Sequence, residues 1–155
     1  MPDIYTSIGR DLAHNRILWI TLSVWVLAQT TKVILGVIKE HRFNFRWFIG
    51  TGGMPSSHAA GASALATAVG LQEGFGTALF AISASFALVT MFDAQGVRRA
   101  TGQQATVLNK MMDDMYWKGQ IEEKRLKELV GHTPIQVLAG LAFGVVSAIV
   151  LYTRT

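Results

Sequence analysis

The chain of 155 residues is 50% hydrophobic and only 15% charged. Its mean hydropathy of +0.33 is too high for an ordinary soluble domain and is typical of a membrane protein. The absence of cysteine excludes a disulfide framework and a thiolate metal site. The formal net charge of +4 is small, and most basic residues flank apolar segments, so membrane orientation explains them better than nucleic-acid binding does.

The first apolar segment, residues 17–38, is long enough to cross a bilayer as a helix at ~1.5 Å per residue. Its length and the lack of a small-residue cleavage site argue against a removable signal peptide. Lys32 lies inside this segment, where an ionisable group either extends to the membrane interface or faces a functional cavity. The sequence leaves both interpretations of Lys32 open.

Two more apolar helices are predicted after a basic and aromatic stretch, residues 39–48, that suits a headgroup interface. Residues 59–71 consist mainly of alanine, glycine, serine and leucine, and this helix is too short to face lipid alone. We expect it to be a central element on which other helices pack closely. A glycine turn follows, and residues 77–92 form the next apolar helix.

The second half of the chain contains one water-exposed region and one further span. Residues 100–131 are expected to form a charged helical hairpin that breaks near Gly119. Pro134 then suits the first turn of a helix whose apolar part covers residues 135–152. We find no repeat or linker, so the prediction for residues 1–155 is a single all-α domain. It is a polytopic membrane helix bundle of about four membrane helices plus the extramembrane hairpin.

The segment 52–58, Gly-Gly-Met-Pro-Ser-Ser-His, lies where a loop changes into the small-residue helix. Gly53 lets the backbone approach a ligand closely, and Ser56 or Ser57 can cap the helix. The N–H groups of the first helical turn favour a phosphate-like anion. His58 adds a group that titrates near neutral pH. The segment therefore predicts an anion site with a proton donor.

The expected spans, about 17–38, 57–72, 76–93 and 134–152, alternate in direction across the membrane. The end of the first, the start of the second, the end of the third and the start of the fourth then share one face. The reactive side chains near those four ends are Lys32, Arg46, Ser56, Ser57, His58, Arg98, Arg99 and His132. No serine lies in a strand–turn–helix elbow, and no histidines or carboxylates are paired at the helical spacing of a zinc site.

Two of these segments resemble motifs of the type 2 phosphatidic acid phosphatase and vanadium haloperoxidase superfamily. Residues 55–58, Pro-Ser-Ser-His, resemble its Pro-Ser-Gly-His motif, and residues 132–140 resemble its His-Tyr-Pro-Ser-Asp-Val-Leu-Ala-Gly segment. Arg98 and Gly102 resemble the arginine and glycine that precede the latter. The likeness covers about residues 32–144 and is greatest to the divergent, short-chain membrane branch.

The resemblance implies a metal-independent phosphatase without a cofactor, which vanadate would inhibit as a phosphate mimic. His132 would attack phosphorus and form a phosphohistidine, and His58 would protonate the leaving oxygen. Arginine and lysine side chains and backbone amides would surround the phosphate. The phosphate-binding candidates are Arg98, Arg99, Lys32, Arg46, Gly53, Ser56 and Ser57.

The chain departs from the family pattern at three places. The first motif, a lysine followed by an arginine and a proline, is reduced to Lys32 with Lys39 and Glu40, for which Arg46 could substitute. Ser57 replaces the glycine of the second motif. Gln136 replaces the aspartate that orients the nucleophilic histidine, and its amide can accept a hydrogen bond but carries no charge. We therefore expect slower chemistry or none, unless Asp93, Asp113 or Asp114 supplies the charge.

Three hypotheses for function remain open. The first is hydrolysis of a lipid or polyprenyl phosphate monoester or pyrophosphate. The second is a non-catalytic membrane protein that binds or transports a phospholipid headgroup in a degenerate phosphatase pocket. The third is a structural helix bundle whose hairpin recruits a soluble partner; His58 and His132 would then be polar residues at helix ends, and Arg98 and Arg99 topology anchors.

Charge distribution predicts the orientation in the membrane. Ten basic residues lie on the face that carries the motifs and three on the other: Lys39, Arg42, Arg46, Arg98, Arg99, Lys110, Lys118, Lys124, Arg125 and Lys127, against Arg10, Arg16 and Arg154. The positive-inside rule then predicts an inner (plasma) membrane protein whose pocket faces the cytoplasm. Small residues in the last helix would also permit a homo-oligomer.

Overall fold

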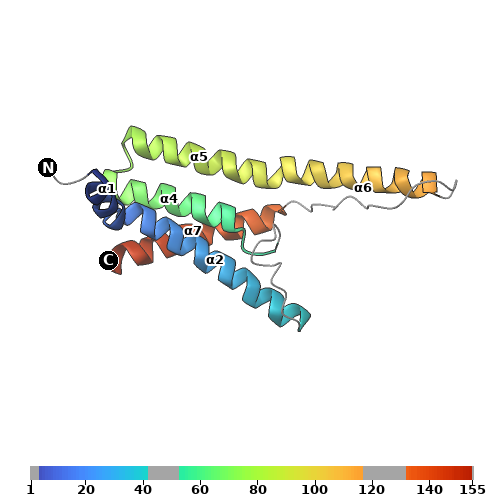
Figure 1. The fold of residues 1–155 in the computed structure, drawn as a ribbon, viewed down its shortest axis with the longest axis horizontal. Helices are drawn as coiled ribbons and strands as arrows, with labels where there is room; N and C mark the ends of the chain where they lie inside the picture. Colours follow the sequence, from blue (N-terminus) through green and yellow to red (C-terminus); the bar gives the residue numbers. More distant parts are fainter. Residues whose placement is uncertain (1–3, 42–52, 117–131, 155) are drawn as a thin grey trace.

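The computed structural model describes the backbone of residues 4–41, 53–116 and 132–154. Within these ranges the chain is entirely helical, which confirms the predicted all-α class (Figure 1). The helices are α1 (Ile4–Ala13), α2 (Arg16–Glu40), α4 (Ser57–Glu73), α5 (Ala78–Gln95), α6 (Val97–Tyr116) and α7 (Pro134–Arg154).

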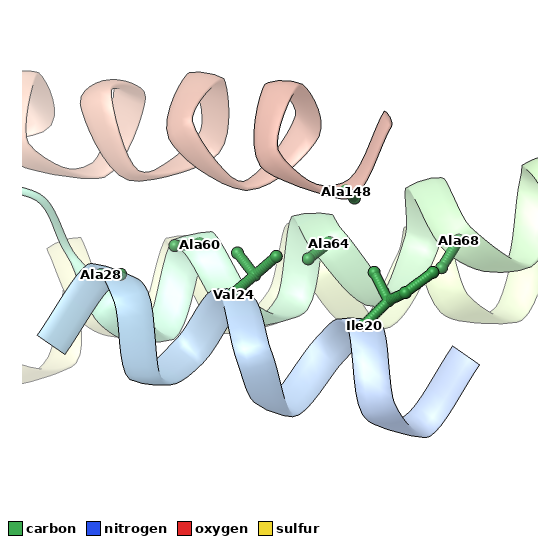
Figure 2. Close-up of a cluster of buried hydrophobic side chains, with 7 residues drawn as sticks. All are labelled: Ile20, Val24, Ala28, Ala60, Ala64, Ala68 and Ala148. Atoms are coloured by element: carbon green, nitrogen blue, oxygen red, sulfur yellow. The ribbon is translucent and has the colours of Figure 1, made fainter. Parts of the chain in front are cut away.

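Helix α4 is the centre of the bundle, as its small side chains predicted. It packs against α2, α5 and α7, and most of its residues from Ser57 to Gly70 are buried. One core cluster joins three helices: Ile20, Val24 and Ala28 of α2, Ala60, Ala64 and Ala68 of α4, and Ala148 of α7 (Figure 2). Alanines dominate α4, so its neighbours approach its backbone closely.

Three helices are long and apolar enough to cross a membrane: α2, α5 and α7. Their outer faces carry large exposed apolar side chains, as expected of surfaces that contact lipid. Helix α4 has only 17 residues and is enclosed by the other three. The prediction of about four membrane helices is therefore corrected to three candidate spans around one short, buried helix.

The helices alternate in direction. Helices α2 and α5 run one way and α4 and α7 the other, so two helix starts and two helix ends meet at one end of the bundle (Figure 1). Two backbone hydrogen bonds join these segments: Ser56 N–H donates to the Gln136 carbonyl and His132 N–H to the Ala94 carbonyl, both at 3.2 Å. We call this end the motif end.

The opposite end of the bundle is closed by contacts between α2, α4 and α7. The Arg16 guanidinium lies 3.8 Å from the centre of the Tyr152 ring and donates a hydrogen bond to the Tyr152 carbonyl. The Tyr152 hydroxyl donates to the Leu71 carbonyl at 3.3 Å. These contacts bind the last turn of α7 to the start of α2 and the end of α4, far from the motif end.

Two elements lie outside the three-span core. Helix α6 continues α5 beyond Gly96 and projects from the bundle, where it forms the first arm of the predicted hairpin (Figure 1). The predicted break at Gly119 and the second arm fall within residues 117–131, outside the described residues. Helix α1 was not predicted; it is followed by Asn15, whose side chain caps α2 by accepting from the Leu18 N–H at 3.0 Å.

Candidate functional site

The loop before α4 brings Lys32 to the motif. Gly53 has a positive φ of 87°, and a Cβ atom at this position would lie 3.0 Å from Lys32 Cγ. Any other residue here would be strained by the positive φ and would crowd the lysine stem. Lys32 is 7% exposed, so its side chain faces the protein and not the surrounding lipid.

The first turn of α4 is ordered by two serines. Ser56 is the N-cap, is fully buried, and accepts a hydrogen bond from the Ala59 N–H at 3.4 Å. Ser57, the first residue of the helix, is 5% exposed. The first-turn N–H groups of α4, which would favour an anion, thus come directly after the loop on which Gly53 contacts Lys32.

The structure brings the two motif histidines together. His58 is half-buried in the first turn of α4, and His132 lies two residues before α7 with only 3% of its surface exposed. Their ring centres are 6.4 Å apart and their planes are inclined by 58°. The two side chains come from distant parts of the sequence, and they meet because α4 and α7 pack in parallel and both begin at the motif end (Figure 1).

Gln136 orients His132 and also caps α7. Its Oε1 atom lies 3.2 Å from His132 Nδ1 and accepts from the Thr133 N–H at 3.1 Å. In return, the Gln136 N–H donates to Thr133 Oγ1 at 3.4 Å. The reciprocal pair is a capping box, for which Thr-x-x-Gln with proline at the first helical position is the sequence signal; it was not predicted above.

This hydrogen bond has a consequence for the chemistry of His132. When Nδ1 donates its proton to Gln136 Oε1, the lone pair of the neutral imidazole is on Nε2. The amide thus selects the tautomer and the ring orientation, as an aspartate does in a hydrolytic triad, but it contributes no negative charge. Gln136 is therefore a positioning residue for His132.

The turn that carries His132 is attached to two other helices. The His132 N–H donates a hydrogen bond to the carbonyl of Ala94 at the end of α5. The N–H of Ser56, the N-cap of α4, donates to the Gln136 carbonyl. Ala59, Ala94 and Val137 form a small buried cluster directly beside these bonds. Because three helices hold the turn, its geometry depends on their packing and not on the local sequence alone.

The remaining predicted ligands are only partly described. Arg98 and Arg99 lie in the first turn of α6, just after α5, and their side chains are outside the described residues, as is all of Arg46. Asp93 is exposed near the end of α5. The group that bonds to His132 Nδ1 is thus Gln136 and not Asp93.

The other histidines and acidic residues lie elsewhere. His14 is exposed beside α1 and its Nδ1 atom is 2.8 Å from the Arg10 carbonyl, while His41 is exposed at the end of α2. Asp113 and Asp114 fall in the last turns of α6, and their side chains are not described. Within the described ranges, no three histidine, aspartate or glutamate side chains gather in a way that could hold a metal ion.

Comparison with known proteins shows the family of the chain. The sequence profile of the "Divergent PAP2 family" matches residues 13–147. The chain is also 42% identical, over 152 residues, to "Uncharacterized membrane protein YuiD" of Bacillus subtilis (strain 168), covering 91% of this chain and 96% of that protein. No solved structure matches the chain. The chain is thus an integral membrane protein that belongs to the divergent PAP2 family, a phosphatase-related branch.

Proposed function

We propose that this protein hydrolyses a lipid or polyprenyl phosphate, a monoester or a pyrophosphate, through a phosphohistidine on His132. The observation that carries the proposal is the pair of histidines at the motif end. His132 is oriented through Nδ1 by Gln136, and the His58 ring centre is 6.4 Å from its own. A nucleophile held by an orienting group, with a second titratable group beside it, is the arrangement that covalent phosphoryl transfer requires.

The proposed reaction has two steps. His132 Nε2 attacks phosphorus as the bond from phosphorus to the lipid oxygen breaks, and His58 gives that oxygen its proton. Neutral His58 then takes a proton from water, which attacks the phosphohistidine, breaks the phosphorus–nitrogen bond and releases inorganic phosphate. Each histidine thus returns to its starting state.

The surrounding groups suit a phosphoryl transition state. Lys32 packs along Gly53, and the first-turn amides of α4 lie at Ser57 and His58. Phosphoryl transfer depends mainly on positioning and on positive charge around the equatorial oxygens. We propose Arg98, Arg99 and Arg46 as further ligands of the phosphate group, because the resemblance to the family implies them.

The test is phosphate release by the purified protein in detergent with a chelator present, from a panel of lipid and polyprenyl phosphates. A ³²P-labelled substrate, quenched early, should leave an acid-labile, base-stable label on the peptide that contains His132. A matched control is His14→Ala, which alters an exposed histidine beside α1 and should release phosphate at the wild-type rate. Release without any label on His132 would contradict the proposed intermediate.

One observation favours the non-catalytic alternative. Gln136 Oε1 serves the helix cap as well as His132, and it brings no charge to the imidazole. A protein that uses this site only to bind a phospholipid headgroup would bind vanadate, release no phosphate from any substrate and never acquire the label.

Changing Gln136 to glutamate should accelerate the reaction about tenfold. Glutamate keeps the capping box and adds a negative charge beside His132 Nδ1, which makes Nε2 more basic and stabilises the imidazolium. A gain of ~1.4 kcal/mol in the transition state corresponds to this factor. Because a neighbouring carboxylate favours the protonated imidazole, the acid limb of the pH–rate profile should move to higher pH.

The control for this prediction is Gln136→Leu, which removes the acceptor. It should slow phosphate release about 10–100-fold, the usual cost of losing a group that orients a functional histidine. Equal rates for the glutamate, leucine and wild-type proteins would show that Gln136 acts only as a cap.

We further propose that the motif end faces the cytoplasm across the inner membrane, because basic residues concentrate there. The cysteine-free chain allows a direct measurement with single cysteines. Lys110→Cys, exposed on α6, should react with an impermeant maleimide only after the cells are permeabilised. Asp11→Cys, exposed on α1, should react in intact cells, and the reverse pattern would invert the orientation.

A further inference from the structure

Helices α5 and α6 follow one another in line and together form a rod that leaves the bundle at the motif end (Figure 1). Gly96 between them keeps right-handed helical angles, φ −89° and ψ −67°, and its N–H donates to the Phe92 carbonyl at 2.7 Å. The 18 residues of α5 are long enough to cross most of the hydrocarbon core at ~1.5 Å per residue. The rod therefore has one half in the membrane and one half, α6, in water.

The membrane half of the rod carries a row of large apolar side chains. Leu79, Ile82, Phe86 and Val89 are each more than half exposed. They follow one another in alternating steps of three and four residues, which is the spacing of a helix that pairs with another helix. Helix α5 packs on α4 with a different face, which contains Ala87. Lipid alone could cover this part of the row.

The row continues on α6, where lipid does not reach. Asp93, exposed on the row near the end of α5, marks the level at which the rod enters water. Beyond it, exposed Gln104 is followed by Val107 and Met111, again in steps of three and four residues, with Leu108 beside them. The three apolar side chains are between 47% and 56% exposed. A contiguous apolar surface of this kind in water indicates an interaction site.

The two halves of the row lie on the same side of the rod. Gln104 follows Phe86 by five full turns at about 3.6 residues per turn, and Val107 follows Val89 by the same distance. The opposite face of α6 is already covered, because Asn109 on it is only 8% exposed. We call the row the α5–α6 seam; it consists of Leu79, Ile82, Phe86, Val89, Gln104, Val107, Leu108 and Met111.

We propose that the α5–α6 seam is the interface of a homodimer in which the rods of two copies lie side by side and parallel. A second copy in the same membrane carries a seam of the same length, at the same depth, with the same change from membrane to water. Each apolar position then meets its counterpart across a two-fold axis. The spacing suits two helices that cross at about 20°. Gln104 would meet Gln104 of the second copy, and one polar position of this kind fixes the register of a helix pair.

The other surface that could join two copies is used within the chain. The small residues of α7 permit close helix contacts, but Gly140 and Gly144 lie against Ser56 and Ala60 of α4. That face of α7 therefore does not compete with the seam for a second copy. Lipid does not compete for the whole seam either, since it would leave the α6 half in water.

Disulfide trapping in isolated membranes tests the interface, because the chain contains no cysteine. On mild oxidation, Met111→Cys should form a disulfide-linked dimer, since identical positions of the seam face each other. Lys110→Cys is the matched control, because Lys110 is exposed on α6 about a quarter-turn away from Met111. Its dimer yield should be several-fold lower. Equal yields at the two positions, or no dimer at Met111, would overturn the proposal and leave the seam to a different partner.

A charge on the seam gives an independent measurement. Met111→Glu places two carboxylates opposite each other in the interface, so the protein mass in mild detergent should fall from that of a dimer to that of the single 16.9 kDa chain. Light scattering measures this mass once the detergent contribution is subtracted. Lys110→Glu changes a charge off the seam and should remain a dimer. A Met111→Glu protein with wild-type helical circular dichroism that is still dimeric would contradict the assignment of the interface.

Discussion

His132→Ala is expected to abolish phosphate release, and His58→Ala to slow it about 10²–10⁴-fold for a lipid phosphate. The two losses differ in origin, because the first variant lacks the nucleophile and the second lacks the group that protonates the leaving oxygen. With p-nitrophenyl phosphate, whose leaving group needs no proton, His58→Ala should recover much of its rate and His132→Ala none. Steady-state rates on both substrates separate the two roles.

Both substitutions should leave the fold intact, which makes the kinetic result interpretable. The turn at His132 is held through its backbone N–H to Ala94, and the capping box between Thr133 and Gln136 does not involve the imidazole. Gel filtration and helical circular dichroism should therefore match wild type. Full activity in either histidine variant would instead favour the structural interpretation of these residues.

Gly144→Ala and Gly140→Ala are expected to destabilise the bundle and to reduce activity together. A Cβ atom at Gly140 would lie 2.5 Å from the Ser56 carbonyl oxygen and 2.9 Å from Ala59 Cβ, and one at Gly144 would lie 2.9 Å from Ala60 Cα. These neighbours are backbone atoms and an alanine methyl group at the start of α4, which cannot rotate away, so α7 must move from α4. Overpacking of this kind costs about 1–3 kcal/mol, more than the ~1 kcal/mol that alanine gains over glycine in a helix.

The measurement is the unfolding midpoint in detergent, which should fall by a few degrees for each variant and further for the pair. Activity should fall as well, because a shifted α7 carries His132 away from His58. Gly76→Ala is the matched control, since no atom lies within 4 Å of a Cβ built there. A stable double variant with wild-type activity would show that α4 and α7 do not pack as closely as described.

Much of the fold can be predicted from the sequence, because a helix that crosses the bilayer needs an apolar run of a fixed minimum length. An apolar run predicted at 17–38 becomes α2, Arg16–Glu40, and one predicted at 135–152 becomes α7, Pro134–Arg154. Helix starts were also readable, since Ser56 has the side chain of an N-cap and Pro134 favours the first helical position. The order of the motifs and the alternating direction of the helices were enough to predict that His58 and His132 meet.

The sequence by itself determined that this is an all-helical membrane protein with histidines in two short motifs, because hydropathy and short motifs are local properties. Only the tertiary structure decided that α4 is enclosed instead of spanning on its own, since burial depends on which helices surround it. Tertiary packing also placed Lys32 against Gly53, because this contact depends on the distance between α2 and the loop before α4. The capping role of Gln136 can be predicted from the Thr-x-x-Gln pattern. Its hydrogen bond to His132 cannot, because it depends on the orientation of one side chain, which no sequence periodicity predicts.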